Sequence, residues 1–184
     1  MKKLLIFAAA AVLLSACGTG GGSSAPSGNS GDGELSVSVE GMEKTDGFIV
    51  EIDGDRVLVN DTYYLIDDNT HLVRLGDGGE QKLTADDLKP GMRADVYHSE
   101  AVAMSYPGQA YADVFTVPDG EEETEREEAF RSFLDKEGEP LLISAPQFGE
   151  GKIRFRCTVL SSNEAFAVEL DTGTHEYSKE PAED

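Results

Sequence analysis

The two cysteine thiols are the side chains of this 184-residue sequence with the clearest potential chemistry. Cys17 follows a basic start, an apolar run over residues 4–14 and two small residues. A charged start, a short apolar run and small residues before a cleavage point are typical of a secretory signal peptide. The run is too short for a transmembrane anchor, which needs about 20 apolar residues. The sequence therefore predicts a signal peptide over residues 1–16 and export of the remainder.

The segment LSAC, residues 14–17, resembles the lipobox of bacterial lipoproteins. That resemblance implies cleavage before Cys17, diacylglycerol on its thiol and at least two acyl chains, such as palmitate. Two chains hold a protein stably on a bilayer, whereas one holds it weakly. We therefore expect Cys17 to be the lipidation site, and the mature protein to lie on the extracytoplasmic face of the bacterial cell membrane.

The second thiol, Cys157, lies in a segment where apolar and polar residues alternate strictly, residues 152–159. It falls on the apolar face with Ile153, Phe155 and Val159. If Cys17 carries lipid, no other cysteine remains in this sequence to form a disulfide with Cys157. A buried thiol of this kind behaves as a small hydrophobic side chain. We expect Cys157 to be an unpaired core residue and not a reactive one.

The sequence has no Gly-x-Ser-x-Gly, Walker or Rossmann motif. The acidic turns at 53–55 and 67–69 lack the full ligand set of a calcium-binding EF-hand loop. The histidines, at positions 71, 98 and 175, are isolated from one another, which argues against a zinc site. We expect no catalytic residue, metal or cofactor, and we expect His98 to be a surface histidine.

The chain carries a net charge of −21, with 36 acidic and 15 basic residues. Nucleic acids and anionic membrane surfaces need cationic contacts, so this charge disfavours both as partners. The negative charge favours cations or basic peptides as binding partners. Residues 18–33 contain no large apolar side chain and are rich in Gly and Ser. Residues 17–34 are thus predicted to be the lipidated cysteine and a flexible tether, with a span of roughly 20 Å.

Residues 35–118 contain short runs with the apolar–polar alternation of half-buried strands and turn signals between them. This pattern predicts a small, closed or nearly closed barrel. Strands are expected at residues 35–39, 48–52, 56–59, 62–66, 71–75, 93–97 and 111–117. The barrel core is expected to hold Phe48, Val50, Ile52, Val57, Val59 and Val96, with Ile49 and Glu51 facing the other way.

Residues 119–175 are predicted to form a helix over 121–136 followed by three strands. So short a segment has little core of its own, and we expect it to pack on the barrel or to form a marginal subdomain. Residues 176–184 are polar and acidic and are predicted to be a disordered tail. The fold class is therefore mainly β, a small OB-like barrel followed by a small α+β extension.

Two stretches of the barrel region carry a family resemblance: residues 88–96, LKPGMRADV, and residues 105–110, SYPGQA. A turn of this form before an alternating strand, followed by Ser-Tyr-Pro-x-Gln-Ala, is similar to the YobA-like lipoprotein domain of Gram-positive bacteria. The resemblance covers about residues 46–117 and implies an exported, OB-like domain of uncharacterised function. OB barrels bind ligands on the face of their second and third strands. By that analogy the candidate ligand-binding residues are Arg56, Tyr64 and Arg74.

These observations favour a non-enzymatic, lipid-anchored extracytoplasmic protein with a binding or envelope-structural role. Its partner would be a protein or a small molecule, not a nucleic acid. One alternative is a binding protein for a small ligand or cation that serves a transporter or sensor, which an enclosed polar pocket would favour. The second is a hydrolase with an unrecognised site, which a cleft with a strongly shifted pKa would favour.

Overall fold

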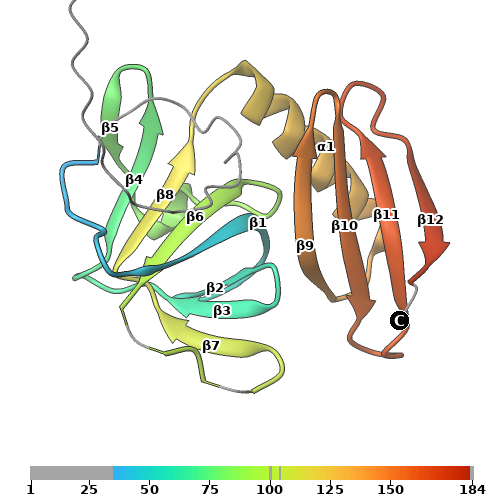
Figure 1. Ribbon diagram of the computed structural model, residues 1–184, viewed down its shortest axis with the longest axis horizontal. Helices are drawn as coiled ribbons and strands as arrows, with labels where there is room; N and C mark the ends of the chain where they lie inside the picture. The colour runs from blue at the N-terminus through green and yellow to red at the C-terminus, as the bar shows by residue number, and fades with distance from the viewer. Residues whose placement is uncertain (1–34, 100, 104, 183–184) are drawn as a thin grey trace, which may run out of the picture.

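The computed structural model describes residues 35–99, 101–103 and 105–182 (Figure 1). The predicted signal peptide, Cys17 and the tether lie outside these residues. None of the described helices is long and apolar enough to cross a membrane. The elements in chain order are β1 (Glu43–Asp53), β2 (Arg56–Val59), β3 (Thr62–Leu65), β4 (His71–Gly76), β5 (Gly79–Lys82), η1 (Ala85–Asp87), β6 (Arg93–His98), β7 (Gly108–Tyr111), β8 (Val114–Pro118), α1 (Glu121–Glu137), β9 (Leu141–Gly149), β10 (Lys152–Val159), β11 (Ala165–Asp171) and β12 (Tyr177–Pro181).

Strands β1 to β8 close into a barrel because β1 and the β7–β8 segment each pair with two different strands (Figure 1). The first half of β1 pairs with β6 and its second half pairs with β2. Strand β7 runs parallel to β3, and β8 runs antiparallel to β6. Between β7 and β8, the chain passes from one neighbour to the other. There the Ala112 amide donates to the Leu65 carbonyl at 3.1 Å, and the Asp113 amide donates to the Tyr97 carbonyl at 3.0 Å. The ring is therefore β1–β2–β3–(β7/β8)–β6, and the β4–β5 hairpin extends it beside β8.

A bulge in β1 decides which residues enter the barrel. The register with β2 shifts between Ile49 and Glu51, so Val50 is the extra residue. Ile49, predicted to face outward, is fully buried in the barrel core, while Ile52 packs at the edge of that core. Phe48 and Val50 belong to a second core. Their assignment to the barrel core was wrong because strict alternation ignores the bulge, whereas Val57, Val59 and Val96 are in the barrel core as predicted.

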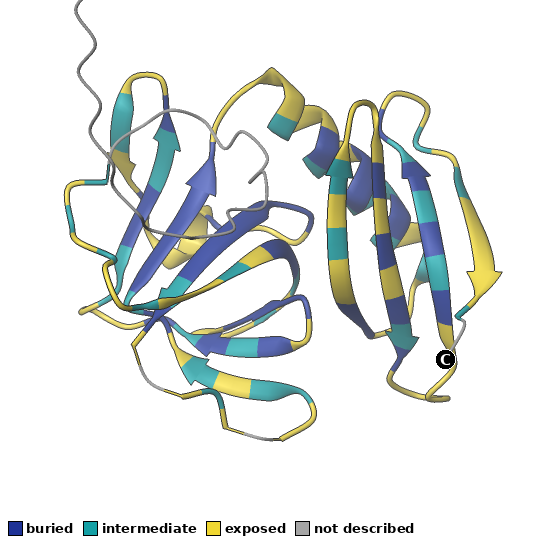
Figure 2. Ribbon diagram, viewed as in Figure 1, coloured by how far each residue is buried: buried dark blue, intermediate teal, exposed yellow. Residues whose placement is uncertain are grey.

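The second core lies between β1, α1 and a four-stranded antiparallel sheet of order β12-β11-β10-β9. Helix α1 covers one face of this sheet (Figure 2), and its buried residues Ala129, Phe130 and Phe133 share a core with residues of the strands. Phe48 reaches in from the barrel and stacks on Phe130, with ring centroids 4.0 Å apart. The α+β extension therefore shares its core with the barrel, which confirms the predicted fold class: mainly β, a barrel-like unit followed by a small α+β unit.

Asn60 joins the two units through its backbone and side chain. Its carbonyl accepts the Ile143 amide of β9 at 3.0 Å. Its amide side chain accepts from the Phe48 amide at 3.2 Å and donates to the Asp46 carbonyl at 2.9 Å. A Cβ at residue 47 would lie 2.0 Å from the Asn60 Oδ1, so Gly47 is what lets this side chain lie against β1.

Several predicted segments differ from the structure. The strand predicted over residues 111–117 is two strands, β7 and β8, and β5 was not predicted. Residues 35–39 form no strand; instead the Ser36 amide and hydroxyl donate to the Glu80 carboxylate at 2.6 and 2.7 Å. The extension has four strands and not three, because β12 lies in the segment predicted to be a disordered tail. Tyr177 explains this difference, since its ring packs on Phe133 at 5.0 Å and its strand pairs with β11 along its length.

A buried ionic cluster also holds α1 against the barrel. Glu123 of α1 accepts from Arg93 of β6 at 3.0 Å and from Arg126, one helical turn further along α1. Both arginines also lie over the ring of Phe148 in β9, at 4.5 and 5.5 Å from its centroid. Asp95 bridges the cluster to Lys44, at 3.0 Å. Charges this deeply buried fix the relative position of α1, β6 and β9.

Candidate ligand-binding face of the barrel

The outer face of β2, β3 and β7 carries a group of side chains that are partly or largely exposed, apart from Leu58, which is fully buried. Strand register places Leu58, Tyr63 and Gln109 in one row across the three strands. The next row holds Arg56, Leu65 and Tyr111. Successive side chains on a strand point to opposite faces, so both rows share the outer face.

Tyr63 is held in place by its neighbours in this face. Its hydroxyl donates to the Glu51 carboxylate at 3.2 Å, and its ring lies 5.2 Å from the Arg56 guanidinium carbon. Arg56 is itself ion-paired with Asp53. Burial, and then the charge of Glu51, raise the pKa of Tyr63 above its usual value. These contacts hold the half-buried ring of Tyr63 in a defined position on the outer face.

The second tyrosine is much more exposed. Tyr111 keeps 56% of its surface open to solvent although it lies in a strand beside Leu65. Tyr63 and Tyr111 both line a groove of about 340 Å³. The short segment at residues 101–103 forms its rim, fixed by the Ala103 amide donating to the Gln109 carbonyl at 2.7 Å. The groove is lined by Arg56, Tyr63, Leu65, Ala101, Ala103, Gln109, Ala110 and Tyr111.

The structure does not bring the three predicted ligand-binding residues together. Arg56 lines the groove. Tyr64 points into the barrel core, where it is 1% exposed and its hydroxyl donates to the Thr45 hydroxyl at 2.7 Å. Arg74 lies on β4, outside the groove lining, and pairs with Asp119 at 3.6 Å. The tyrosine that lines the groove is Tyr63, one residue earlier, because Tyr64 shares the inward face with Ile66.

The histidines are far from forming a common site. His71 contacts the Glu80 carboxylate at 3.1 Å, and the carbonyl of His175 accepts from Lys136 at 2.7 Å. His98, predicted to be a surface residue, is 2% exposed and lies beside the Tyr64 ring at 5.8 Å. It is buried because β6 carries it to the inside of the barrel. Within the described part of the chain, no three His, Cys, Asp or Glu residues are placed to hold a metal ion.

Cys157 is buried as predicted and lies in the second core, and the residues that the structure describes give it no disulfide partner. Burial raises the pKa of its thiol to about 12, and the nearby Glu137 charge acts in the same direction. Thiolate is the reactive form of cysteine. In a Cys17→Ala variant, where Cys157 is the remaining thiol, we expect labelling by a thiol reagent to be slow at pH 8 and to become fast in denaturant. Fast labelling of the native protein would contradict this assignment.

Comparison of the chain with protein-family models, with curated proteins and with solved structures finds no match.

Proposed function

We propose that this chain is a lipid-anchored, extracytoplasmic binding protein without enzymatic activity, and that the groove lined by Tyr63 and Tyr111 is its ligand site. The observation that carries the proposal is the groove itself. Two tyrosines, one half-buried and one exposed, line a groove together with Arg56 and Gln109, which carry planar polar groups. Binding sites typically combine an apolar surface with a few placed polar groups. A YobA-like, OB-type module remains part of this proposal, and the ring order of the barrel supports it.

The chemistry of the groove favours a neutral oligosaccharide. A sugar ring has an apolar face of C–H groups that packs on an aromatic ring, and hydroxyls that planar amide and guanidinium groups can bind. Glu51 and Asp53 stand beside the groove and the chain carries a charge of −21, so an anionic polymer such as a nucleic acid is repelled there. Oligosaccharides are also among the ligands that OB barrels bind on this face.

The test is a titration of the protein with neutral hexasaccharides, one of N-acetylglucosamine and one of glucose. We expect at least one to bind, and Tyr111→Ala and Tyr63→Ala each to weaken that binding about tenfold or more, the equivalent of about 1.4 kcal/mol. Tyr106→Ala is the matched control, because Tyr106 is 65% exposed but does not line the groove. Failure of both sugars to bind, or equal losses from all three variants, would rule out the proposed site.

The anchoring part of the proposal has its own test, because it rests on residues 1–17 alone. In a bacterial host, Cys17→Ala should release the protein from the membrane fraction or leave the signal peptide uncleaved. The parent protein should be cleaved and should fractionate with membranes. If the variant is cleaved and still fractionates with membranes like the parent, Cys17 is not the anchor.

A further inference from the structure

The tyrosine groove, which Tyr63 and Tyr111 line, contains one member of an ion pair. Asp53 ends β1 and Arg56 begins β2, and the two residues are partners across the hairpin turn. The Asp53 carboxylate accepts a hydrogen bond from Nη2 of Arg56 and forms an ion pair with it. The side chains of Arg56 and Asp53 are 46% and 58% exposed, so a molecule in the groove can compete with Asp53 for the guanidinium.

Contacts around Arg56 give this part of the barrel more negative than positive charge. The Arg56 guanidinium carbon lies 5.2 Å from the centroid of the Tyr63 ring, and the Tyr63 hydroxyl donates to Glu51 at 3.2 Å. Two carboxylates, those of Glu51 and Asp53, therefore accompany one guanidinium. An arginine without such a neighbour binds a carboxylate or a sulfate through two parallel hydrogen bonds. At Arg56 the carboxylate of Asp53 already holds the place of that anion.

We propose that Asp53 is the residue that restricts the tyrosine groove to uncharged sugars, an inference that rests on the proposed function of that groove. A guanidinium group has five N–H donors, so the pair with Asp53 leaves donors for the hydroxyls of a sugar. The carboxylate of a uronic acid, in contrast, would have to displace Asp53 from Arg56. It would then be repelled by the charges of both Asp53 and Glu51. The groove therefore excludes glycans built from uronic acids although it contains an arginine.

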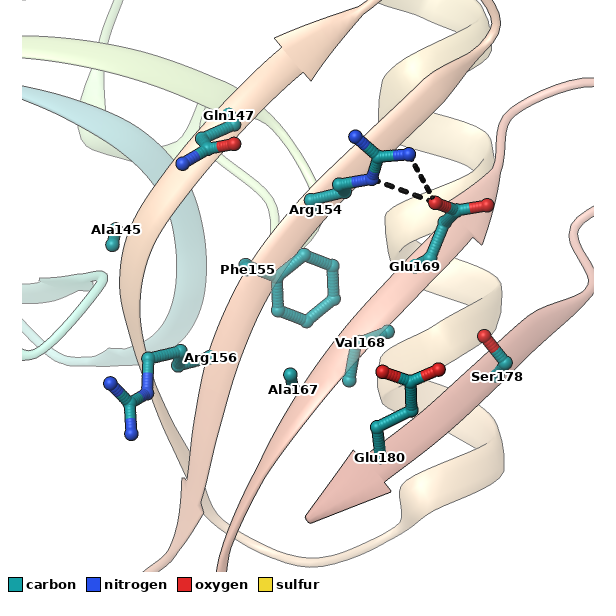
Figure 3. Close-up of a pocket in the computed structure, with 10 residues that line it drawn as sticks. All are labelled: Ala145, Gln147, Arg154, Phe155, Arg156, Ala167, Val168, Glu169, Ser178 and Glu180. Carbon is teal, nitrogen blue, oxygen red and sulfur yellow. Dashed lines mark hydrogen bonds and ion pairs between the residues drawn. The ribbon is translucent and has the colours of Figure 1, made fainter. Parts of the chain in front are cut away.

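A second groove with arginine side chains provides a control for the place of binding. It measures about 340 Å³ and crosses the face of the C-terminal sheet that α1 leaves open (Figure 3). Arg154 and Glu169 both line it, and the Arg154 Nε donates to the Glu169 carboxylate at 2.7 Å. The two grooves share no lining residue. An acidic sugar attracted to arginine in general would bind in both grooves, so a substitution of Arg154 shows whether the second one takes part.

The test uses calorimetry on the full chain with Cys17→Ala and three hexasaccharides, of glucose, of N-acetylglucosamine and of glucuronic acid. We expect the glucuronic acid chain to bind at least about tenfold more weakly than the better of the two neutral chains. Asp53→Asn keeps an oxygen that accepts from Arg56 but removes the charge. It should strengthen binding of the glucuronic acid chain about tenfold and change that of the neutral chain less than about twofold. The gain should disappear in about 1 M salt, which screens exposed charges.

Asp55→Asn is the matched control, because it removes an equal charge from an exposed residue of the same turn and leaves the pair of Asp53 and Arg56 intact. It should change binding of the glucuronic acid chain less than about threefold. Arg154→Ala, added to Asp53→Asn, should leave the gain unchanged. The urea midpoint of Asp53→Asn should match that of the parent, because exposed ion pairs contribute little to stability.

Three results would overturn the role of Asp53 while a neutral chain still binds, and they would leave the proposed function of the groove intact. The first is equally tight binding of the glucuronic acid chain and the neutral chain by the parent. The second is no gain in Asp53→Asn, or the same gain in Asp55→Asn. The third is loss of the gain on Arg154→Ala, which would place the acidic sugar in the second groove. If neither neutral chain binds the parent, the proposed function itself fails, and the role of Asp53 fails with it.

Discussion

Phe48→Ala is expected to lower the free energy of unfolding by about 3–5 kcal/mol, the usual cost of truncating a buried phenylalanine. Phe48 is fully buried although it lies on a barrel strand, because its ring enters the second core and contacts Phe130 and Phe148. Its loss leaves a cavity where the two units meet. Against a typical total of about 5–15 kcal/mol, this is a large share of the stability.

Urea unfolding followed by far-ultraviolet circular dichroism measures this effect. Tyr111→Ala is the control, because it truncates an aromatic residue that is 56% exposed, and it should change the stability by less than about 0.5 kcal/mol. A shared core predicts one transition that moves to lower urea in Phe48→Ala. The contrary result is two separate transitions in the parent protein, of which the substitution shifts only one. That result would show that the barrel and the C-terminal unit fold independently.

Glu123→Ala is expected to cost about 3 kcal/mol, because it leaves two buried arginines without the carboxylate between them. The Glu123 side chain is 12% exposed, and those of Arg93 and Arg126 are 6% and 9% exposed. Removing one partner from a buried ionic cluster costs more than the pair itself contributes, because the remaining charge stays away from water.

Glu122→Ala provides a matched control for this substitution. Glu122 lies in the same first turn of α1 and also pairs with Arg126, but its side chain is 65% exposed. Exposed ion pairs contribute about 0–1 kcal/mol, and both substitutions remove the same favourable interaction with the helix dipole. Chemical denaturation of the two variants should therefore give losses that differ by about 2 kcal/mol or more. Similar losses would mean that the cluster is solvated.

The class of fold was predictable because it depends on patterns that repeat along the chain. Alternation in β10 placed Cys157 on the buried face, and the turn signals placed β2, β3, β4 and β6 close to their observed bounds. They missed β5, and they gave β7 and β8 as one strand over residues 111–117. The bulge at Val50 was not predictable in the same way, since one extra residue leaves no compositional trace. It reversed the assignments of Phe48 and Ile49, and with them the place where the extension attaches.

The candidate binding face was only partly predictable. The analogy with OB barrels selected β2 and β3, and it found Arg56. It chose Tyr64 over Tyr63, although the alternation of Tyr64 with the apolar Ile66 is a signal that Tyr64 faces inward. Gln109 and Tyr111 join the site through the parallel pairing of β7 with β3. That contact links strands more than 40 residues apart, and local patterns carry no information about it.

The most direct test of the central claim is a two-dimensional amide NMR titration of the protein with the neutral hexasaccharide that binds it. The proposed site predicts that the largest shifts fall on β3 and β7, at Tyr63, Gln109 and Tyr111, with smaller ones at Arg56. It also predicts that the C-terminal sheet is unaffected and that Tyr111→Ala removes the shifts. Shifts concentrated on β10 and β11, or spread evenly over the barrel, would contradict the assignment of the tyrosine groove as the ligand site.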